Sequence, residues 1–545
     1  MKLRATVVHL PAAIAAAGAA LLVIQWAAAR PLWLDEEFLA INLRDRGIPN
    51  YLEALWLGQT APFGWLVLER LVVIAFGTGE RALRLLPMLF GIATLAAAVW
   101  IGRRWMTTVG ATVLVVLCAC SQWLTFYFLE LKSYSADAFF ALLLPAIAAW
   151  SVDESTVGRP FQGRHRGPER PAPETAFWIV AAIAQWFGNG ALFVTPLCAV
   201  ALAAIILRRN GWRSALRFSL VALVWLVSFA LNYVFVLRHA QSYAFFQRFW
   251  AFAFPPSSSG VVGALQWFGT TLAGFGVKPG STRFGVLLWL AAAAGFAAGA
   301  KRRTTVAICF ATVPLSALLL AALHLVPFYE RVTLWIVPAL YVGVALLADV
   351  ASISSAAVVG LCAAILICGD VVIRGVPDAI VRARARQENR GHDDRGAVRW
   401  LASQKQPGDV WMTTHYGVLA IWWYAGITGH RIVEVAHQPE GPECRQDALP
   451  ALIADAPRVL LYLGFRFDDV PKGFDDRLVD RLSRLGEVTA YRSFANEGHA
   501  LVIDRRATPG QPATLSQLVS RSAGNDRPTD GCFALRIAEI PTFVR

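Results

Sequence analysis

Long apolar blocks follow one another through the first 373 residues and constrain the fold more than any other feature. A helix that crosses a bilayer needs about 20 mainly apolar residues. Only 16% of all residues are charged and 56% are hydrophobic, which is too apolar for a water-soluble protein of this length. We therefore expect a polytopic membrane protein. The clear blocks are residues 7–29, 85–101, 108–127, 133–150, 218–236, 284–300, 304–323, 332–349 and 354–373.

Two further segments decide the number of crossings. Residues 62–77 are apolar but short, and they carry Glu69 and Arg70 at their centre. A charge pair there would cost a few kcal/mol in the bilayer core, so we predict a helix that lies at the membrane interface. Residues 176–207 are broken by Gly188-Asn189-Gly190 and flanked by arginines at both ends, which predicts a hairpin of two crossings. The expected total is about eleven transmembrane helices.

The basic clusters between the blocks set the predicted orientation, because cytoplasmic loops are enriched in Lys and Arg. With a cytoplasmic N-terminus, the clusters at 103–104, 159–170, 208–217 and 301–303 all lie inside. A crossing at 62–77 would place them outside. The net charge of +13 is thus explained by topology in the cytoplasmic membrane, and no nucleic-acid partner is predicted. The first block resembles a signal peptide, but its apolar stretch is too long, so we expect it to remain as an anchor.

Residues 374–545 have an ordinary polar composition and form the second predicted domain, beyond the membrane domain at 1–373. Alternating short strands and helices predict a small extracytoplasmic α/β domain. The tail from 508 to 528 is rich in Pro, Ser and Gly, which is typical of mobile segments. The predicted strands are 410–414, 459–463, 488–494 and 500–504, and the predicted helices are 394–406, 417–424 and 475–485.

The polar residues of this second domain give no specific site. Cys444 and Cys532 could form a disulfide in an oxidising compartment. The spacing of His415, His430 and His437 fits no metal-binding template, so surface histidines are the default interpretation.

Three charged patches fall on the predicted outer face. The first loop opens with Leu34-Asp35-Glu36-Glu37, directly after the first helix. A second outer turn reads Glu130-Leu131-Lys132-Ser133-Tyr134, with Asp137 one turn into the next helix, and a third carries Glu330-Arg331. Any one patch is explained by the polarity of interfacial loops. Their joint occurrence suits a site for a lipid-linked, charged substrate, and burial beside apolar helix would raise the pKa of a carboxyl toward that of a useful base.

Five short motifs also occur in a fixed order between about residues 30 and 340. This series resembles that of the GT-C type glycosyltransferases, including the protein O-mannosyltransferases and the bacterial enzymes that decorate lipid A with aminoarabinose or galacturonic acid. The motifs are Leu34-Asp35-Glu36, Ala61-Pro62-Phe63-Gly64-Trp65-Leu66, Arg84-Leu85-Leu86-Pro87, Glu130-Leu131-Lys132-Ser133-Tyr134 and Glu330-Arg331 with Pro338.

The resemblance implies a GT-C like membrane bundle and a sugar donor carried on a polyprenyl phosphate. It further implies transfer to a lipid, glycan or protein of the envelope. Some residues depart from the pattern. Ala61 replaces a first proline, Lys132 stands where Arg is common, and Val332 replaces a late Tyr. Gln59-Thr60 stands where a basic residue often precedes the prolines.

Roles follow from this resemblance and from the chemistry of glycosyl transfer. The acceptor hydroxyl must lose a proton, and Asp35 is the expected general base, with Glu36 as the substitute or an orienting group. The leaving phosphate needs cations, for which Arg331 and Lys132 are the candidates and Arg84 a weaker third. Glu130 and Asp137 are expected to bind the acceptor, to assist proton transfer or to join Asp35 in a divalent-cation site, and Tyr134 is grouped with them. A helix cap or an ion pair between Glu130 and Lys132 is the structural alternative.

Two other classes of protein remain open from the sequence. A transporter or lipid flippase would place its ionisable groups near the middle of the membrane. A structural or assembly protein would use the outer domain to bind a partner. The aromatic stretch 243–254 is interpreted as an interfacial belt segment, with a cover for the site as the alternative.

Overall fold

The computed structural model describes residues 2–157, 173–241, 248–256, 258, 260–351, 358–426, 431–438, 449–465, 473–495, 498–507, 514–519 and 532–539. The chain divides into two compact units. We call residues 1–28 and 47–384 the helical unit, and residues 29–46 and 385–545 the α/β unit. The first outer loop is therefore split between them, and the last helix of the helical unit continues past residue 373 to Arg384.

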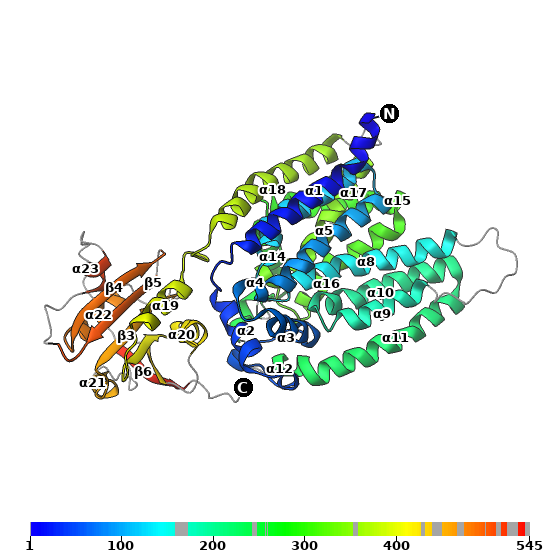
Figure 1. Ribbon diagram of the computed structural model, residues 1–545. Coiled ribbons are helices and arrows are strands. Elements are labelled where there is room, and N and C mark those ends of the chain that lie inside the picture. The colour runs from blue at the N-terminus through cyan, green and yellow to red at the C-terminus, as the bar shows by residue number, and fades with distance from the viewer. Residues whose placement is uncertain are drawn as a thin grey trace. The chain divides into compact units, whose positions relative to one another are not determined.

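Apolar helices build the helical unit (Figure 1). Their order is α1 (Lys2–Ala27), η1 (Ile48–Leu52), η2 (Trp56–Gly58), α3 (Phe63–Phe76), α4 (Glu80–Leu83), α5 (Leu85–Trp105), α6 (Thr108–Cys120), α7 (Gln122–Tyr127), α8 (Tyr134–Val157), α9 (Pro173–Ala184), α10 (Asn189–Asn210), α11 (Trp212–Asn232), η3 (Tyr233–Leu237), α12 (Arg238–Gln241), η4 (Ala251–Ala253), α14 (Gly260–Phe275), α15 (Gly285–Arg302), α16 (Thr304–Ala322), η6 (Glu330–Ile336), α17 (Val337–Ala351) and α18 (Val358–Arg384).

Among the described residues, eight helices are long and apolar enough to cross a membrane. The other three predicted crossings also form helices, namely α6, α9 and α15, which are shorter. The polytopic helical fold with a C-terminal α/β part is thus confirmed. Residues 62–77 form the predicted helix, α3, which is 14 residues long. Helix α14 was not predicted, because its glycines and threonines lower the hydrophobicity of the segment.

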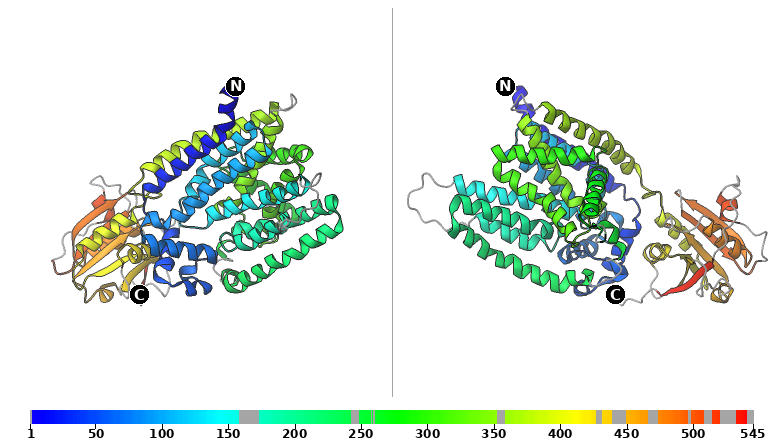
Figure 2. Two further views of the ribbon diagram at one scale, coloured as in Figure 1. Left: turned by 45° about the vertical axis from the view of Figure 1, so that its right-hand side comes forward. Right: turned by 180° about the vertical axis from the view of Figure 1, so that it is seen from behind.

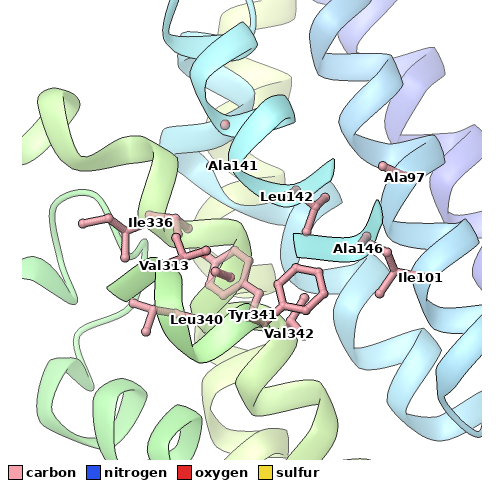
Figure 3. Close-up of a cluster of buried hydrophobic side chains, with 14 of the residues drawn as sticks. Ala97, Ile101, Ala141, Leu142, Ala146, Val313, Ile336, Leu340, Tyr341 and Val342 are labelled. Carbon is pink, nitrogen blue, oxygen red and sulfur yellow. The ribbon is translucent and has the colours of Figure 1, made fainter. Parts of the chain in front are cut away.

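The core of the helical unit lies where α5, α8, α16 and α17 meet. Tyr341 and Leu340 of α17 are fully enclosed, next to Val313 of α16 and Leu142 of α8 (Figure 3). Helix α18 runs beside α1, as two views agree (Figure 1, Figure 2). Its Arg382 fixes this contact, since Nε donates to Oε1 of Gln25 at 2.9 Å and Nη2 donates to Oγ1 of Thr125 at 2.8 Å.

A close helix contact joins α15 to α17 through two glycines. A Cβ added at Gly295 would lie 1.8 Å from the carbonyl oxygen of Gly343. Small residues at such contacts let the two backbones approach, which is how helices associate in membranes.

Gly295→Val is therefore expected to force α15 away from α17 and to destabilise the fold by about 1–3 kcal/mol. The matched control is Gly269→Val on α14, where an added Cβ meets nothing within 4 Å. Thermal melting in detergent should show a lowered Tm for the first variant and an unchanged Tm for the control. Equal melting of both would refute the close-contact interpretation.

A six-stranded sheet organises the α/β unit, with strand order β4-β5-β3-β1-β2-β6. Strands β2, β1 and β3 are parallel, while β4, β5 and β6 pair antiparallel with their neighbours. The elements are α2 (Leu34–Asp45), α19 (Asp394–Gln404), β1 (Val410–Thr414), α20 (Gly417–Tyr424), β2 (Arg431–Gln438), α21 (Leu449–Leu452), β3 (Arg458–Leu463), α22 (Phe474–Ser483), β4 (Glu487–Phe494), β5 (Gly498–Asp504), α23 (Leu515–Val519) and β6 (Cys532–Glu539).

All four predicted strands and all three predicted helices of this unit are present, whereas β2 and β6 were missed. Of the predicted mobile tail, the structure describes residues 514–519, which include α23. His430 and Cys444 lie outside the described residues, as do the side chains of His437 and Cys532. The disulfide prediction therefore stays a prediction.

Helix α2 belongs to the α/β unit and packs against α20. Nη1 of Arg44 donates to the carbonyl oxygen of Trp423 at 3.0 Å, and Nε1 of Trp422 donates to Oδ2 of Asp45 at 3.1 Å. At the other end, the N–H of Leu32 donates to the Tyr424 hydroxyl at 2.8 Å. The segment that follows α1 is thus bound to the α/β unit by these hydrogen bonds.

Candidate active site

The acidic motif of the first loop forms the first turn of α2. Asp35, Glu36 and Glu37 follow Trp33, the N-cap residue. Carboxylates are stabilised at this end of a helix by its unpaired N–H groups and its dipole. The three side chains differ in exposure: Asp35 is half-buried, whereas Glu36 and Glu37 are fully enclosed.

Glu36 has a local structural role. Its Oε2 accepts a hydrogen bond from the Trp33 N–H at 2.9 Å, which is the return half of a capping box. The Asn389 amide also donates to this oxygen at 3.4 Å, and it donates to the carbonyl oxygen of Pro31 at 3.1 Å. Glu36 therefore orders the turn that presents Asp35.

Glu37 points into the α/β unit, where it meets Asp394 at the start of α19. Burial raises the pKa of the Glu37 carboxyl well above its ordinary value, and the nearby Asp394 and Glu36 carboxyls raise it further. The Tyr462 hydroxyl of β3 donates to Oδ1 of Asp394. The sequence alone does not reveal this cluster, because Asp394 marks only the start of a predicted helix and Tyr462 is part of an apolar strand.

In the helical unit, the turn between α7 and α8 carries Glu130, Lys132 and Tyr134. Nζ of Lys132 donates to Oε1 of Gln59 at 2.7 Å, so the loop before α3 reaches this turn. Glu130 is enclosed, and its charge interacts with that of Arg382 on α18. The Tyr134 ring packs edge-on against Tyr127 at 5.2 Å between ring centroids.

Asp137 lies in the first turn of α8 and caps another helix. Its Oδ1 accepts a hydrogen bond from the Gly190 N–H at 3.1 Å, at the start of α10. A Cβ at Gly190 would come within 2.3 Å of the Asp137 carbonyl oxygen, so the two backbones touch. In this geometry the Asp137 carboxylate caps the first turn of α10.

Arg331 lies in the first turn of η6, which packs against both α7 and α8. The element that carries Arg331 therefore lies beside the two helices that flank the turn with Lys132. Oε1 of the neighbouring Glu330 is 3.3 Å from Nζ of Lys278, a cation that the sequence analysis did not single out. Burial raises the pKa of the Tyr329 phenol, Glu330 adds to this, and Arg331 opposes it.

Aromatic side chains surround the turn before η6. The Tyr329 ring lies 4.9 Å from Phe252 and 6.1 Å from Trp250, measured between ring centroids. His324 stacks on Phe254 at 5.3 Å, and its Nε2 is 2.9 Å from the carbonyl oxygen of Pro255. The described part of the aromatic stretch 243–254 thus packs against Tyr329 and His324, while residues 243–247 lie outside the described residues.

Arg84 is buried at the junction of α4 and α5. Its carbonyl oxygen accepts a hydrogen bond from the Met88 N–H at 3.2 Å. For a divalent cation, no group of three or more His, Cys, Asp or Glu side chains with suitable geometry occurs in the part of the chain that the structure describes. Lys132 and Arg331 thus belong to the helical unit, and Asp35 and Glu36 belong to the α/β unit.

No family model matches the sequence, and no curated protein matches it significantly. Among solved structures, the chain is similar to ArnT from Cupriavidus metallidurans bound to undecaprenyl phosphate, with 13% identity and a TM-score of 0.48 over 91% of this chain and 98% of that one. The apo form of the same ArnT gives 13% identity and a TM-score of 0.49, over 90% and 97% of the two chains. The oligosaccharyltransferase from Archaeoglobus fulgidus gives 12% identity and a TM-score of 0.46, over 83% and 69%.

Proposed function

We propose that this chain is a multi-pass glycosyltransferase of the cytoplasmic membrane. It transfers a sugar from a polyprenyl-phosphate donor to a lipid, glycan or protein acceptor of the cell envelope, on the outer face. The ordered series of five motifs between Leu34 and Pro338 carries this proposal. The N-terminus is cytoplasmic and the α/β unit extracytoplasmic, as the distribution of basic loops indicates.

Asp35 is the general base in this mechanism. It removes the proton of the acceptor hydroxyl as the oxygen attacks the anomeric carbon of the donor sugar, and the polyprenyl phosphate leaves. Its half-buried position at the start of α2 supports this choice over Glu36, whose Oε2 already accepts two hydrogen bonds in an enclosed turn.

Cations stabilise the leaving phosphate in this mechanism. Negative charge grows on the phosphate oxygens as the glycosidic bond breaks, and fixed positive groups lower the barrier by binding that charge. Arg331 and Lys132 are the candidates for this role, because Lys132 lies in the turn between α7 and α8 and Arg331 lies on η6, which packs against both helices. Arg84 is too deeply buried at its helix junction to be more than a supporting charge.

Gln59 orients Lys132 in this proposal, since its Oε1 fixes the ammonium group at 2.7 Å. Gln59→Ala is expected to raise the KM for the donor by about tenfold, because a hydrogen bond to a charged group contributes about 1.5 kcal/mol. Gln266→Ala, an exposed amide on α14, is the matched control. Donor kinetics that stay unchanged in the Gln59 variant would remove this role.

One experiment tests the function as a whole. Envelope glycolipids and glycans are analysed by mass spectrometry from cells with and without the chain, and from cells that carry Asp35→Asn. The expected result is one sugar modification that disappears without the chain and also in the variant. Identical envelope profiles in all three strains would reject the transferase and favour the transporter or assembly alternatives.

A further inference from the structure

The carboxyl groups of Glu37 and Asp394 form a buried pair inside the α/β unit. Glu37 is 0% exposed and Asp394 is 8% exposed. Neither carboxyl oxygen of Glu37 accepts a hydrogen bond from an N–H or O–H donor among the described residues. Instead, the Glu37 carboxyl lies within hydrogen-bonding reach of the Asp394 carboxyl. Two ionised carboxylates are both acceptors, so this contact is a hydrogen bond only when one of them carries a proton.

The groups around the pair determine which of the two carboxyls is protonated. Oδ1 of Asp394 accepts from the Tyr462 hydroxyl, which favours the ionised form of Asp394. Among the described residues no comparable donor reaches Glu37, so Glu37 carries the proton and donates to Asp394. Burial raises the pKa of Glu37 well above its ordinary value, and the effect of Asp394 has the same sign.

Other titratable groups lie around the pair. Glu36 on α2 raises the pKa of Glu37 further. Burial and Asp393 before α19 raise the pKa of Asp394, whereas the hydrogen bond from Tyr462 on β3 and the nearby His392 lower it. A second negative charge in this enclosed space is therefore unfavourable, as in other sites where two carboxyls share one proton.

We propose that the Glu37–Asp394 pair is a proton-dependent latch that docks the first turn of α2 onto α19 and β3, and thereby positions Asp35. The other anchors of α2 do not need this proton, because Arg44 holds its last turn to α20 through backbone carbonyls. Loss of the proton would loosen the turn that carries Asp35 and leave the opposite end attached. This inference rests on the proposed role of Asp35 and deepens it, with Glu37 as a positioning residue.

The sign of the pH dependence follows directly. The pKa of Glu37 in the folded protein is raised above its value in the unfolded chain. The stabilisation is therefore complete below the ordinary carboxyl range and is lost as the pH rises through the raised pKa. Asp35 must be ionised to act as a base, so its contribution rises with pH. Transfer should show a bell-shaped pH profile, with Asp35 on the acid limb and the latch on the alkaline limb.

Glu37→Gln separates the latch from simple packing. The glutamine amide donates to Asp394 at every pH, so the hydrogen bond remains and its titration disappears. We expect the alkaline limb, which falls up to about tenfold per pH unit in the natural chain, to flatten in this variant. The Tm of the full-length natural chain in detergent should fall as the pH rises between about pH 5 and pH 9. In Glu37→Gln this fall should disappear. Asp394→Asn is a second variant: it removes a carboxylate that raises the pKa of Glu37 but leaves Glu37 buried and titratable, so the decline of Tm with pH should be reduced and not abolished.

Glu388→Gln is the matched control, because it removes an exposed carboxylate just before α19. Its Tm and transfer profiles should follow those of the natural chain. A Tm that declines with pH in Glu37→Gln and Asp394→Asn as it does in the natural chain would overturn the latch. A flattened Tm profile in a chain without transferase activity would support the latch and reject the proposed function, so the two failures are distinguishable.

Discussion

Asp35→Asn is expected to lower the rate of sugar transfer by about 10²- to 10⁴-fold. Asparagine has the shape of aspartate and can be accommodated at a half-buried position, but it cannot take a proton from the acceptor hydroxyl. The variant should insert into the membrane and melt as the natural chain does. Transfer is measured as the yield of the modified envelope product per amount of purified chain, at saturating donor, so that weakened donor binding does not enter the result.

The control for this variant is Glu53→Gln, an exposed acid of the same outer loop that lies outside the motif. It should transfer at the natural rate. The acid limb of the pH profile provides a second check, since the ionisation of Asp35 should control it. Full activity in Asp35→Asn would move the base to another residue, and the same measurement on Glu36→Gln would then test the substitute.

The fold was largely predictable from the sequence because a membrane permits few solutions. Backbone N–H and C=O groups find no water in the bilayer core, so apolar blocks of sufficient length become helices. All eleven predicted crossings are helical. The strands β2 and β6 were missed because Arg431 and Glu434 interrupt the apolar pattern of the first, and because the second follows a stretch that looked like a mobile tail.

The candidate site was predictable only in part, since its contacts join residues that no local pattern connects. The sequence indicated Asp137 as a functional carboxylate, but its hydrogen bond to Gly190 depends on where α10 begins. In the sequence, Gln59 stands out only because a basic residue is common at its position. Its contact with Lys132 depends on the path of the loop before α3, which the sequence does not reveal. The partner of Glu37 lies in the other half of the chain, and only the packing of α2 within the α/β unit brings the two carboxyls together.

Arg331→Ala is expected to have the second largest effect, a loss of about 10²- to 10³-fold in the transfer rate, comparable with removing one preorganised donor to a developing oxyanion. The guanidinium of arginine offers two parallel donors that match the oxygens of a phosphate, so it binds donor and leaving group in a fixed orientation. The position of Arg331 beside α7 and α8 supports this role. The affinity for synthetic polyprenyl phosphate, measured in detergent, should fall together with the rate.

Two further variants separate charge from geometry at this position. Arg331→Lys keeps the positive charge but lacks the two parallel donors of the guanidinium. Compared with Arg331→Ala, it should therefore recover part of the affinity for polyprenyl phosphate and a smaller part of the transfer rate. Arg302→Ala removes an exposed cation at the end of α15 and should change neither quantity. If Arg331→Ala bound polyprenyl phosphate as tightly as the natural chain and transferred at the natural rate, the phosphate contact would have to be reassigned to Lys132, whose replacement by alanine would then show the full loss.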